Sequence, residues 1–184
     1  WTVAPGTETL TTACAAICVD YTNDQIMYLG TGDANYYSNG IGILKSTNGG
    51  ASFSATSLTN CLVIEMLQNP TNPAEFLAAT NKGIYKSSNS GLSWTATTAT
   101  NLPFCDMKAN ATPSSQIIYA TTHENVPKLF RSTNYGSTWT QITSGIVTSN
   151  TVVTAGARVA VTPSDPNVVY FEVIGDGGIV HKSN

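Results

Sequence analysis

The sequence predicts an all-β fold made of many short strands, and two observations carry this prediction. Only 10% of its 184 residues are charged, whereas Thr, Ser, Asn and Gly are abundant, and this composition favours strands and tight turns over helices. A short motif also recurs at long intervals along the chain. Because 41% of the residues are hydrophobic, the chain can bury a core, and the recurring motif indicates that one arrangement of strands is repeated around it.

The motif has the form basic-Ser-x-Asn-x-Gly-x-(Ser/Thr)-aromatic. We expect a hairpin turn at each copy, because a short Asn side chain bonds to nearby backbone amides and Gly adopts φ values that other residues avoid. The aromatic residue would pack back between sheets. These residues are therefore predicted to be structural. The three copies contain Ser46, Asn48, Gly50 and Phe53; Ser87, Asn89, Gly91 and Trp94; and Ser132, Asn134, Gly136 and Trp139.

The spacing of the motif identifies the repeated unit. The motif serines are 41 and 45 positions apart, and units of roughly 40 to 50 residues are typical of four-stranded β-propeller blades. An apolar strand lies upstream of the motif position in each unit, and a Pro-marked turn precedes three of these strands. We name the strands of a blade a to d, with the motif joining c to d. The upstream strands are residues 26–30, 75–79, 117–121 and 168–172, and the Pro turns are residues 69–73, 112–115 and 162–166.

The repeat predicts about four blades of four antiparallel strands. Trp1–Val3 matches the start of a strand d, and Lys182–Asn184 matches the start of a fourth motif. We therefore expect part of a larger propeller whose remaining blades are partners of this segment, although pairing of the first strand with the last could also close four blades. The predicted units are residues 1–10 (the last strand of a preceding blade), 11–58, 59–99, 100–144, and 145–184 (an incomplete blade).

The motifs resemble the Asp-box (BNR) repeats of sortilin-like and xyloglucanase-like propellers, with Asn48, Asn89 and Asn134 standing where that family often has Asp. Residues 28–33, 42–46 and 162–170 are also similar to long secreted proteins of the Bacteroidetes type, which are commonly exported by type IX secretion. The resemblance implies a secreted or outer-surface location and contact with secretion machinery. It implies no single activity, because the family includes sialidases, endoglucanases, sorting receptors and assembly factors.

The b-to-c loops, on the face opposite the motif turns, differ most between blades, and binding usually resides in such loops. The first of these loops contains Asp33, Asn35, Tyr36 and Tyr37, and the third begins with His123. The tyrosine rings offer a surface for stacking, and the neighbouring polar side chains offer hydrogen bonds, as a sugar or a peptide ligand needs. These five residues therefore form the predicted ligand-binding site. Alternatively, the tyrosine loop only packs on its neighbours or on another blade.

Several classes of site and partner lack support in the sequence. His123 and His181 have no partner at ligand spacing and the cysteines form no CxxC pair, so we predict no metal and no cofactor. A net charge of −3 with eight dispersed Lys and Arg residues gives no reason to expect nucleic acid. No apolar run approaches the roughly 20 residues that cross a bilayer, so no membrane span is predicted.

Counting back from three aligned aromatic residues places three cysteines at one position of the innermost strand a. We expect them to be buried thiols that pack beside the central channel or between blades, and a disulfide across two blades, such as Cys14 with Cys61, is the alternative. The aromatic residues are Tyr28, Phe76 and Tyr119, and the cysteines are Cys14, Cys61 and Cys105.

Catalysis has weaker support than binding. A xyloglucanase-like mechanism needs two carboxyl groups roughly 5 to 10 Å apart, and Asp33, Glu124 and Asp176 lie in the appropriate loops. A sialidase would need several arginines, but the chain has only Arg131 and Arg158. We therefore assign no catalytic residue and predict a non-catalytic glycan- or protein-binding or scaffold module of an exported cargo protein or adhesin. Part of a glycoside hydrolase and a passive spacer are the alternatives.

Overall fold

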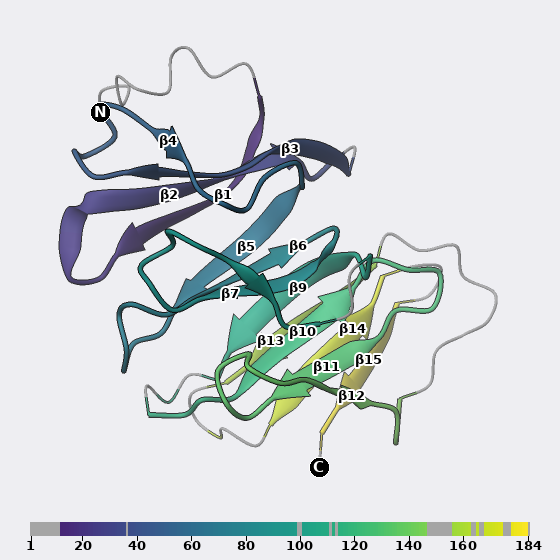
Figure 1. Cartoon of the computed structure of the whole chain (residues 1–184). Coiled ribbons are helices and arrows are strands. Elements are labelled where there is room, and N and C mark those ends of the chain that lie inside the picture. The colour runs from purple at the N-terminus through teal and green to yellow at the C-terminus, as the bar shows by residue number, and fades with distance from the viewer. Residues whose placement is uncertain are drawn as a thin grey trace.

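The computed structural model of the protein describes residues 12–35, 37–98, 101–110, 112, 114–146, 156–162, 165, 168–174 and 178–183. Within these residues every regular element is a β-strand, and the strands form four antiparallel sheets (Figure 1). The predicted all-β fold is therefore confirmed. The strand predicted within residues 1–10 lies outside the described residues.

We call the sheets blades 1 to 4, and the strands of each blade pair in chain order. Blade 1 contains β1 (Cys14–Asp20), β2 (Asn23–Asp33), β3 (Ser38–Ser46) and β4 (Ser54–Ala55). Blade 2 contains β5 (Val63–Gln68), β6 (Phe76–Thr80), β7 (Gly83–Ser87) and β8 (Thr95–Ala96). Blade 3 contains β9 (Phe104–Ala109), β10 (Ile118–Thr122), β11 (Leu129–Ser132) and β12 (Thr140–Ile142). The described part of blade 4 contains β13 (Ala157–Val161), β14 (Val169–Val173) and β15 (Ile179–Lys182).

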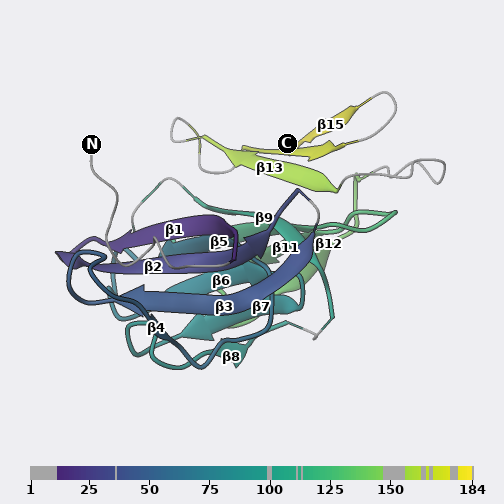
Figure 2. The ribbon, with the colours of Figure 1, turned by 90° about the horizontal axis from the view of Figure 1, so that it is seen from above.

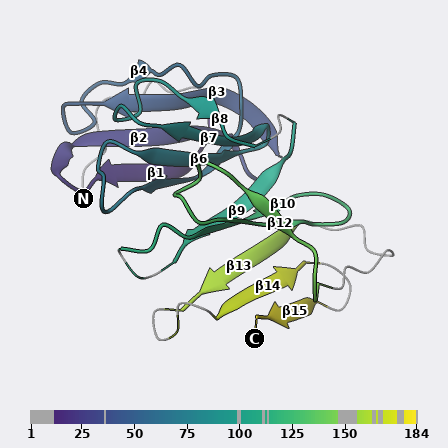
Figure 3. The ribbon, with the colours of Figure 1, turned by 60° about the horizontal axis from the view of Figure 1, so that its bottom comes forward.

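The blades follow one another in an arc, with the first strand of each blade on the inside. Strand β1 packs next to β5, β5 next to β9, and β9 next to β13. Figure 2 shows β1, β5 and β9 side by side, and Figure 3 shows the succession of blades from β1 to β15. The chain is thus part of a β-propeller, as the repeat predicted.

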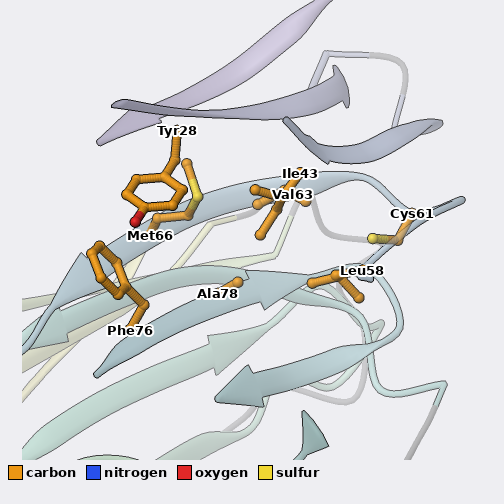
Figure 4. Close-up of a cluster of buried hydrophobic side chains, with 8 residues drawn as sticks. All are labelled: Tyr28, Ile43, Leu58, Cys61, Val63, Met66, Phe76 and Ala78. Carbon is orange, nitrogen blue, oxygen red and sulfur yellow. The ribbon is translucent and has the colours of Figure 1, made fainter. Parts of the chain in front are cut away.

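The hydrophobic core lies between successive blades. Between blades 1 and 2, Tyr28 and Ile43 pack against Val63, Met66 and Phe76, and the rings of Tyr28 and Phe76 have centroids 4.7 Å apart (Figure 4). Full burial of one such side chain stabilises the fold by about 1.5–3 kcal/mol. Equivalent clusters fill the next two spaces. They contain Leu77, Ile84, Phe104, Met107 and Ile118 between blades 2 and 3, and Tyr119, Leu129, Val159, Val169 and Phe171 between blades 3 and 4.

Three turns that we call box turns 1 to 3 join strand c to strand d. In box turn 2, the Ser87 hydroxyl donates to Asn89 Oδ1 (3.0 Å) and accepts from the Gly91 N–H (2.9 Å). Asn89 Oδ1 also accepts from the Ser93 N–H (2.9 Å), and Asn89 Nδ2 donates to Ser93 Oγ (2.8 Å). The other two turns have the same hydrogen bonds. In each turn the motif side chains therefore bond to groups of that same turn and stabilise its backbone conformation. The box turns comprise residues Ser46–Phe53, Ser87–Trp94 and Ser132–Trp139.

Side chains of the inner strands bond to the backbone of the next blade. Glu65 Oε2 accepts from the N–H of Met107 on β9 (3.0 Å), and Asp106 Oδ2 accepts from the N–H of Val159 on β13 (2.8 Å). Lys108 donates to both carboxylates, at 2.7 Å from Glu65 Oε1 and 2.8 Å from Asp106 Oδ1. These bonds satisfy N–H groups that face a neighbouring sheet, and they link blades 2, 3 and 4 near the inside of the arc.

The prediction that three cysteines share one position is wrong. Thr31, Thr80 and Thr122 are equivalent residues on the second strands of blades 1 to 3. They pair with Cys14, Val63 and Phe104 on the first strands, so the three cysteines are not equivalent. Two causes explain the error. The residue equivalent to Tyr28 is Leu77 and not Phe76, because Tyr28 pairs with Lys45 as Leu77 pairs with Lys86. The strand register also shifts near the start of β1, β5 and β9, so counting residues back from the second strand does not identify equivalent positions on the first.

All four cysteines lie within the described residues, and each has a free thiol. The prediction of buried thiols is confirmed for Cys61 and Cys105 and is wrong for Cys14, which is exposed at the start of β1. Burial raises the pKa of the Cys61 thiol to about 11, so this thiol stays protonated at neutral pH and packs as a small apolar side chain.

Candidate functional site

The loops that follow the second strand of each blade gather on one side of the arc, which we call the loop face. The first of these loops joins β2 to β3, the second is the turn Asn81–Lys82, and the third joins β10 to β11. The box turns and the turns between the first two strands lie at the opposite ends of the same strands. The loop face is therefore formed by the segments that differ most between repeats.

Tyr37 and His123 meet on the loop face although they come from blades 1 and 3. Their rings are stacked, with centroids 4.3 Å apart and planes 19° apart. The Tyr37 hydroxyl also donates to the carbonyl oxygen of Phe104 at the start of β9 (2.7 Å), and Tyr37 has a left-handed φ of 53°. Two of the predicted ligand-binding residues are thus in direct contact, and one face of each ring is used for that contact.

Blade 4 also approaches this stacked pair. A Cβ atom at Gly156 would lie 3.0 Å from His123 Cδ2 and 2.9 Å from Cys105 Sγ, and Gly156 has a φ of 100°, so only glycine fits there. Arg158 follows on β13 and donates to the Cys105 carbonyl (3.2 Å). The Tyr37–His123 cluster, defined as these two residues with Cys105, Gly156 and Arg158, therefore joins three blades.

The electrostatic environment of the cluster keeps Tyr37 neutral. Burial raises the pKa of the Tyr37 hydroxyl well above its ordinary value, and the charges of Cys105 and Glu124 act in the same direction while Arg158 opposes them. The His123 ring nitrogens make no hydrogen bond to any residue in the described ranges. The exposed part of the imidazole can stack on a ligand or form hydrogen bonds with it, whereas the Tyr37 hydroxyl uses its one proton in the bond to the Phe104 carbonyl.

The remaining predicted binding residues lie in the first loop. Asp33 is the last residue of β2, and its Oδ1 accepts from the Asn35 N–H (2.9 Å). This bond shapes the loop as an Asx turn. Asn35 is exposed, and Tyr36 lies outside the described residues. The structure thus brings Asp33 and Asn35 together at one end of the loop, with Tyr37 at its other end.

The two candidate catalytic acids in the described ranges each make a hydrogen bond within their own loop. Glu124 Oε1 accepts from Lys128 Nζ (2.9 Å) within its own loop, and Asp33 bonds to the backbone of the first loop. Asp176 lies outside the described residues. In the ranges that the structure describes, no cluster of three or more His, Cys, Asp and Glu side chains is arranged to hold a metal ion. None of the described residues belongs to a helix long and apolar enough to span a membrane.

A cleft of about 510 Å³ opens between blades 3 and 4, away from the Tyr37–His123 cluster. Its lining combines aromatic, aliphatic and cationic side chains. They include Tyr119, Leu129, Arg131 and Ile142 from blade 3 and Phe171, His181 and Lys182 from blade 4.

Sequence reasoning missed the carboxylates of the inner strands. Burial raises the pKa of Glu65, and Lys108 lowers it in part. Burial acts to lower the pKa of Lys108, but its hydrogen bonds to Asp106 and Glu65 outweigh this effect and raise it. No local motif marks these residues, because the partners come from different blades.

A second missed feature had a signal in the sequence. Asp20, Asn69 and Asn110 each accept a hydrogen bond from the backbone N–H two residues later, at 2.8, 3.0 and 3.0 Å. Each closes the turn between the first two strands of its blade. The pattern Asp/Asn-x-Thr recurs at all three turns and could have been read from the sequence.

Solved structures of several other proteins share this fold. No protein-family model matches the chain, and no curated protein matches it either. An ancestral GH74 enzyme superposes with a TM-score of 0.68 at 20% identity, covering 94% of this chain and 25% of its own. The GH74 xyloglucanase of Xanthomonas campestris gives a TM-score of 0.66 at 14% identity, covering 98% of this chain and 30% of its own.

A third solved structure, YCF48 bound to D1 peptide, gives a TM-score of 0.50 at 14% identity and covers 92% of this chain and 53% of its own. These similarities establish the propeller fold. The chain spans 25% to 30% of the length of the three GH74 chains that it matches.

Proposed function

We propose that the chain is a non-catalytic glycan-binding module of a secreted or cell-surface propeller protein, and that it binds through the loop face. The observation that carries this proposal is the stacking of Tyr37 on His123 across two blades. A site assembled from loops of separate blades is held rigid by the sheets beneath it, which lowers the entropy lost on binding. Asp33 and Asn35 add hydrogen-bonding groups beside the aromatic rings, as sugar recognition requires.

The comparisons support the choice of a glycan. Several propellers with this fold are GH74 enzymes, and one of them is a xyloglucanase. A protein ligand is the alternative, because one neighbour was solved with a bound peptide. The resemblance of the three turns to Asp-box repeats supports the secreted location, since that class of propeller is common outside the cell.

Titration calorimetry with a xyloglucan oligosaccharide tests the proposal. The wild-type protein is expected to bind, and His123→Ala is expected to weaken binding about tenfold or more, because the imidazole provides both a stacking surface and hydrogen-bonding nitrogens. Combined replacement of Tyr36 and Tyr37 by Ala is expected to do the same. The matched control is Tyr21→Ala, because Tyr21 is 68% exposed in the turn between β1 and β2, on the opposite side of the arc.

Two results would contradict the proposal. Equal affinities of the wild type, His123→Ala and Tyr21→Ala would mean that the ligand binds elsewhere. No binding of this glycan by a folded wild type, together with binding of a peptide ligand, would replace the glycan with a protein.

Glycoside hydrolysis is the second candidate, and the GH74 neighbours support it. In that case Asp33, Glu124 and Asp176 supply an acid and a base or nucleophile. The release of reducing ends from xyloglucan distinguishes the two functions. Release that falls sharply in Asp33→Asn or Glu124→Gln would favour hydrolysis, whereas binding without release supports the non-catalytic module.

A further inference from the structure

In two successive inter-blade spaces an aromatic ring lies beneath a lysine, but the ring comes from opposite sides of the space. Between blades 1 and 2 it belongs to Tyr28 on β2, the cross-strand neighbour of Lys45 on β3. Lys45 Nζ lies 5.4 Å from the centroid of this ring. The Tyr28 hydroxyl and Lys45 Nζ both donate to the Ser90 carbonyl of box turn 2, each at 2.8 Å. Blade 1 therefore supplies the ring, and box turn 2 supplies a small side chain.

Between blades 2 and 3 the ring comes from the box turn. Leu77 and Lys86 are the cross-strand pair of blade 2 that corresponds to Tyr28 and Lys45. The ring beneath Lys86 is that of Tyr135 in box turn 3, and its centroid lies 5.7 Å from Lys86 Nζ. Tyr135 is 1% exposed and packs in the same hydrophobic cluster as Leu77. Blade 2 therefore supplies an aliphatic side chain, and box turn 3 supplies the ring.

Ser90 and Tyr135 occupy the same position in their turns. Both precede the motif glycine and have a left-handed backbone, with φ of 56° and 47°. The Ser90 N–H donates to the Ala74 carbonyl (2.9 Å), and the Tyr135 N–H donates to the Gln116 carbonyl (2.8 Å), each within its own blade. The two turns are therefore held alike by their own blades, and they differ in the side chain that enters the inter-blade space.

The second strand of the following blade differs in step with the turn. Phe76 and Ile118 are equivalent residues, because each pairs with the motif serine of its own blade. The ring of Phe76 packs on Tyr28, whereas Ile118 lies in the cluster that contains Tyr135 (Figure 4). Two aromatic residues therefore meet a turn with Ser90 in one space, and two aliphatic residues meet a turn with Tyr135 in the other.

Both box turns lie tightly against the preceding blade. A Cβ atom at Gly91 would lie 2.5 Å from Tyr28 Cε1, and one at Gly136 would lie 2.4 Å from Leu77 Cδ2. Protein interiors are close-packed, so an added ring strains such a contact and a missing ring leaves a cavity. A box turn with the wrong residue before its glycine therefore lowers the stability of either pair of blades.

The hydroxyl groups of the two tyrosines differ as well. The Tyr28 hydroxyl bonds to the Ser90 carbonyl, whereas the buried Tyr135 hydroxyl has no hydrogen-bond partner in the part of the chain that the structure describes. A buried hydroxyl without a partner lowers stability. Box turn 3 therefore stabilises its contact with blade 2 through the ring of Tyr135.

We propose that this exchange determines which box turn each blade accepts. Blade 1 accepts a turn with a small residue before the glycine, and blade 2 requires a turn with an aromatic residue there. Box turns 2 and 3 each fit the blade that precedes them in the chain and not the other one. Similar repeats can pair in the wrong order, within one chain or between two copies, and a mismatch at this position disfavours such pairings.

Thermal unfolding of matched variants of the full chain tests this proposal. Ser90→Tyr adds a ring beside those of Tyr28 and Phe76, and the blade change, Tyr28→Leu with Phe76→Ile, removes both of those rings. Each is expected to lower the midpoint by roughly 5 °C or more. The combined variant copies the residues of the next inter-blade space, and we expect it to lose less than half of the sum of the separate losses. The backbone allows Ser90→Tyr, because Tyr135 has nearly the same φ.

The matched control combines the blade change with Ser90→Ala, which adds no ring, and it is expected to recover nothing. The reverse exchange in the other space, Leu77→Tyr and Ile118→Phe with Tyr135→Ser, is expected to show the same recovery as the first. If Ser90→Tyr alone does not fold, folding of the combined variant supports the proposal. Combined variants in both spaces that fail to fold, or that lose as much as the sum of their separate losses, would overturn it.

Discussion

Each box turn contains two successive residues in the left-handed backbone conformation, and only the second must be glycine. In box turn 2 these are Ser90 (φ 56°) and Gly91 (φ 73°), and in box turn 3 they are Tyr135 (φ 47°) and Gly136 (φ 71°). The first position is Ser90 in box turn 2 and Tyr135 in box turn 3, so it accepts residues other than glycine. The second position also touches the preceding blade, so a side chain there would be strained and would collide.

Replacement of Gly91 by Ala separates these two effects when it is compared with Gly145→Ala. Gly145 has nearly the same φ (75°), but a Cβ atom there has no neighbour within 4 Å. We expect Gly145→Ala to lower the free energy of unfolding by about 1–2 kcal/mol through backbone strain alone. Gly91→Ala is expected to cost about 1–3 kcal/mol more, because the added carbon meets the Tyr28 ring. Urea unfolding followed by circular dichroism measures both, and equal losses would contradict the packing argument.

At the scale of the strands, contacts between blades depend on polar side chains as well as on the hydrophobic clusters. Inner strands of adjacent blades do not share a sheet, so their facing N–H groups need other acceptors. Asp106 supplies one to Val159, and it is itself 6% exposed. Its link to Lys108 and Glu65 spreads this contact over three blades.

Asp106→Ala is therefore expected to lower the free energy of unfolding by about 1–3 kcal/mol, because the buried N–H of Val159 loses its acceptor. Asp106→Asn keeps one acceptor oxygen and is expected to lose less. The control is Glu172→Ala, an exposed acid on β14, which is expected to change stability by less than about 0.5 kcal/mol. Chemical denaturation at neutral pH measures all three, and a stability of Asp106→Ala equal to that of the control would contradict the proposed role.

The repeat made the blades predictable from the sequence, whereas the contacts between blades were not. The motif spacing predicted four units with the correct order of strands, because each unit is built from local turns and alternating apolar residues. Phe76 was misaligned with Tyr28 because both are aromatic and both enter the same inter-blade space, from opposite sides. Asp106 carries no sequence signal for Val159, since the contact depends on how two blades pack.

At the scale of the whole molecule, the loop face joins blades that are not neighbours in the chain. Sequence reasoning assigned Tyr37 and His123 to one ligand-binding site, but it could not predict that their rings are in contact, because the arc of blades determines their distance. The structure stacks them and adds Gly156 from blade 4. The proposed binding function depends on this assembly, because a ligand would meet the loops of several blades as one surface.

The most direct test of this assembly is a double-mutant cycle between Tyr37 and His123 in urea unfolding. The single variants Tyr37→Ala and His123→Ala and the double variant give the coupling energy, and His123→Ala combined with Tyr21→Ala provides the reference. We expect a coupling of about 0.5–1.5 kcal/mol for Tyr37 with His123, as for aromatic rings in contact, and additivity for the reference pair. A coupling for Tyr37 with His123 that is no larger than that of the reference pair would contradict a loop face built jointly by blades 1 and 3.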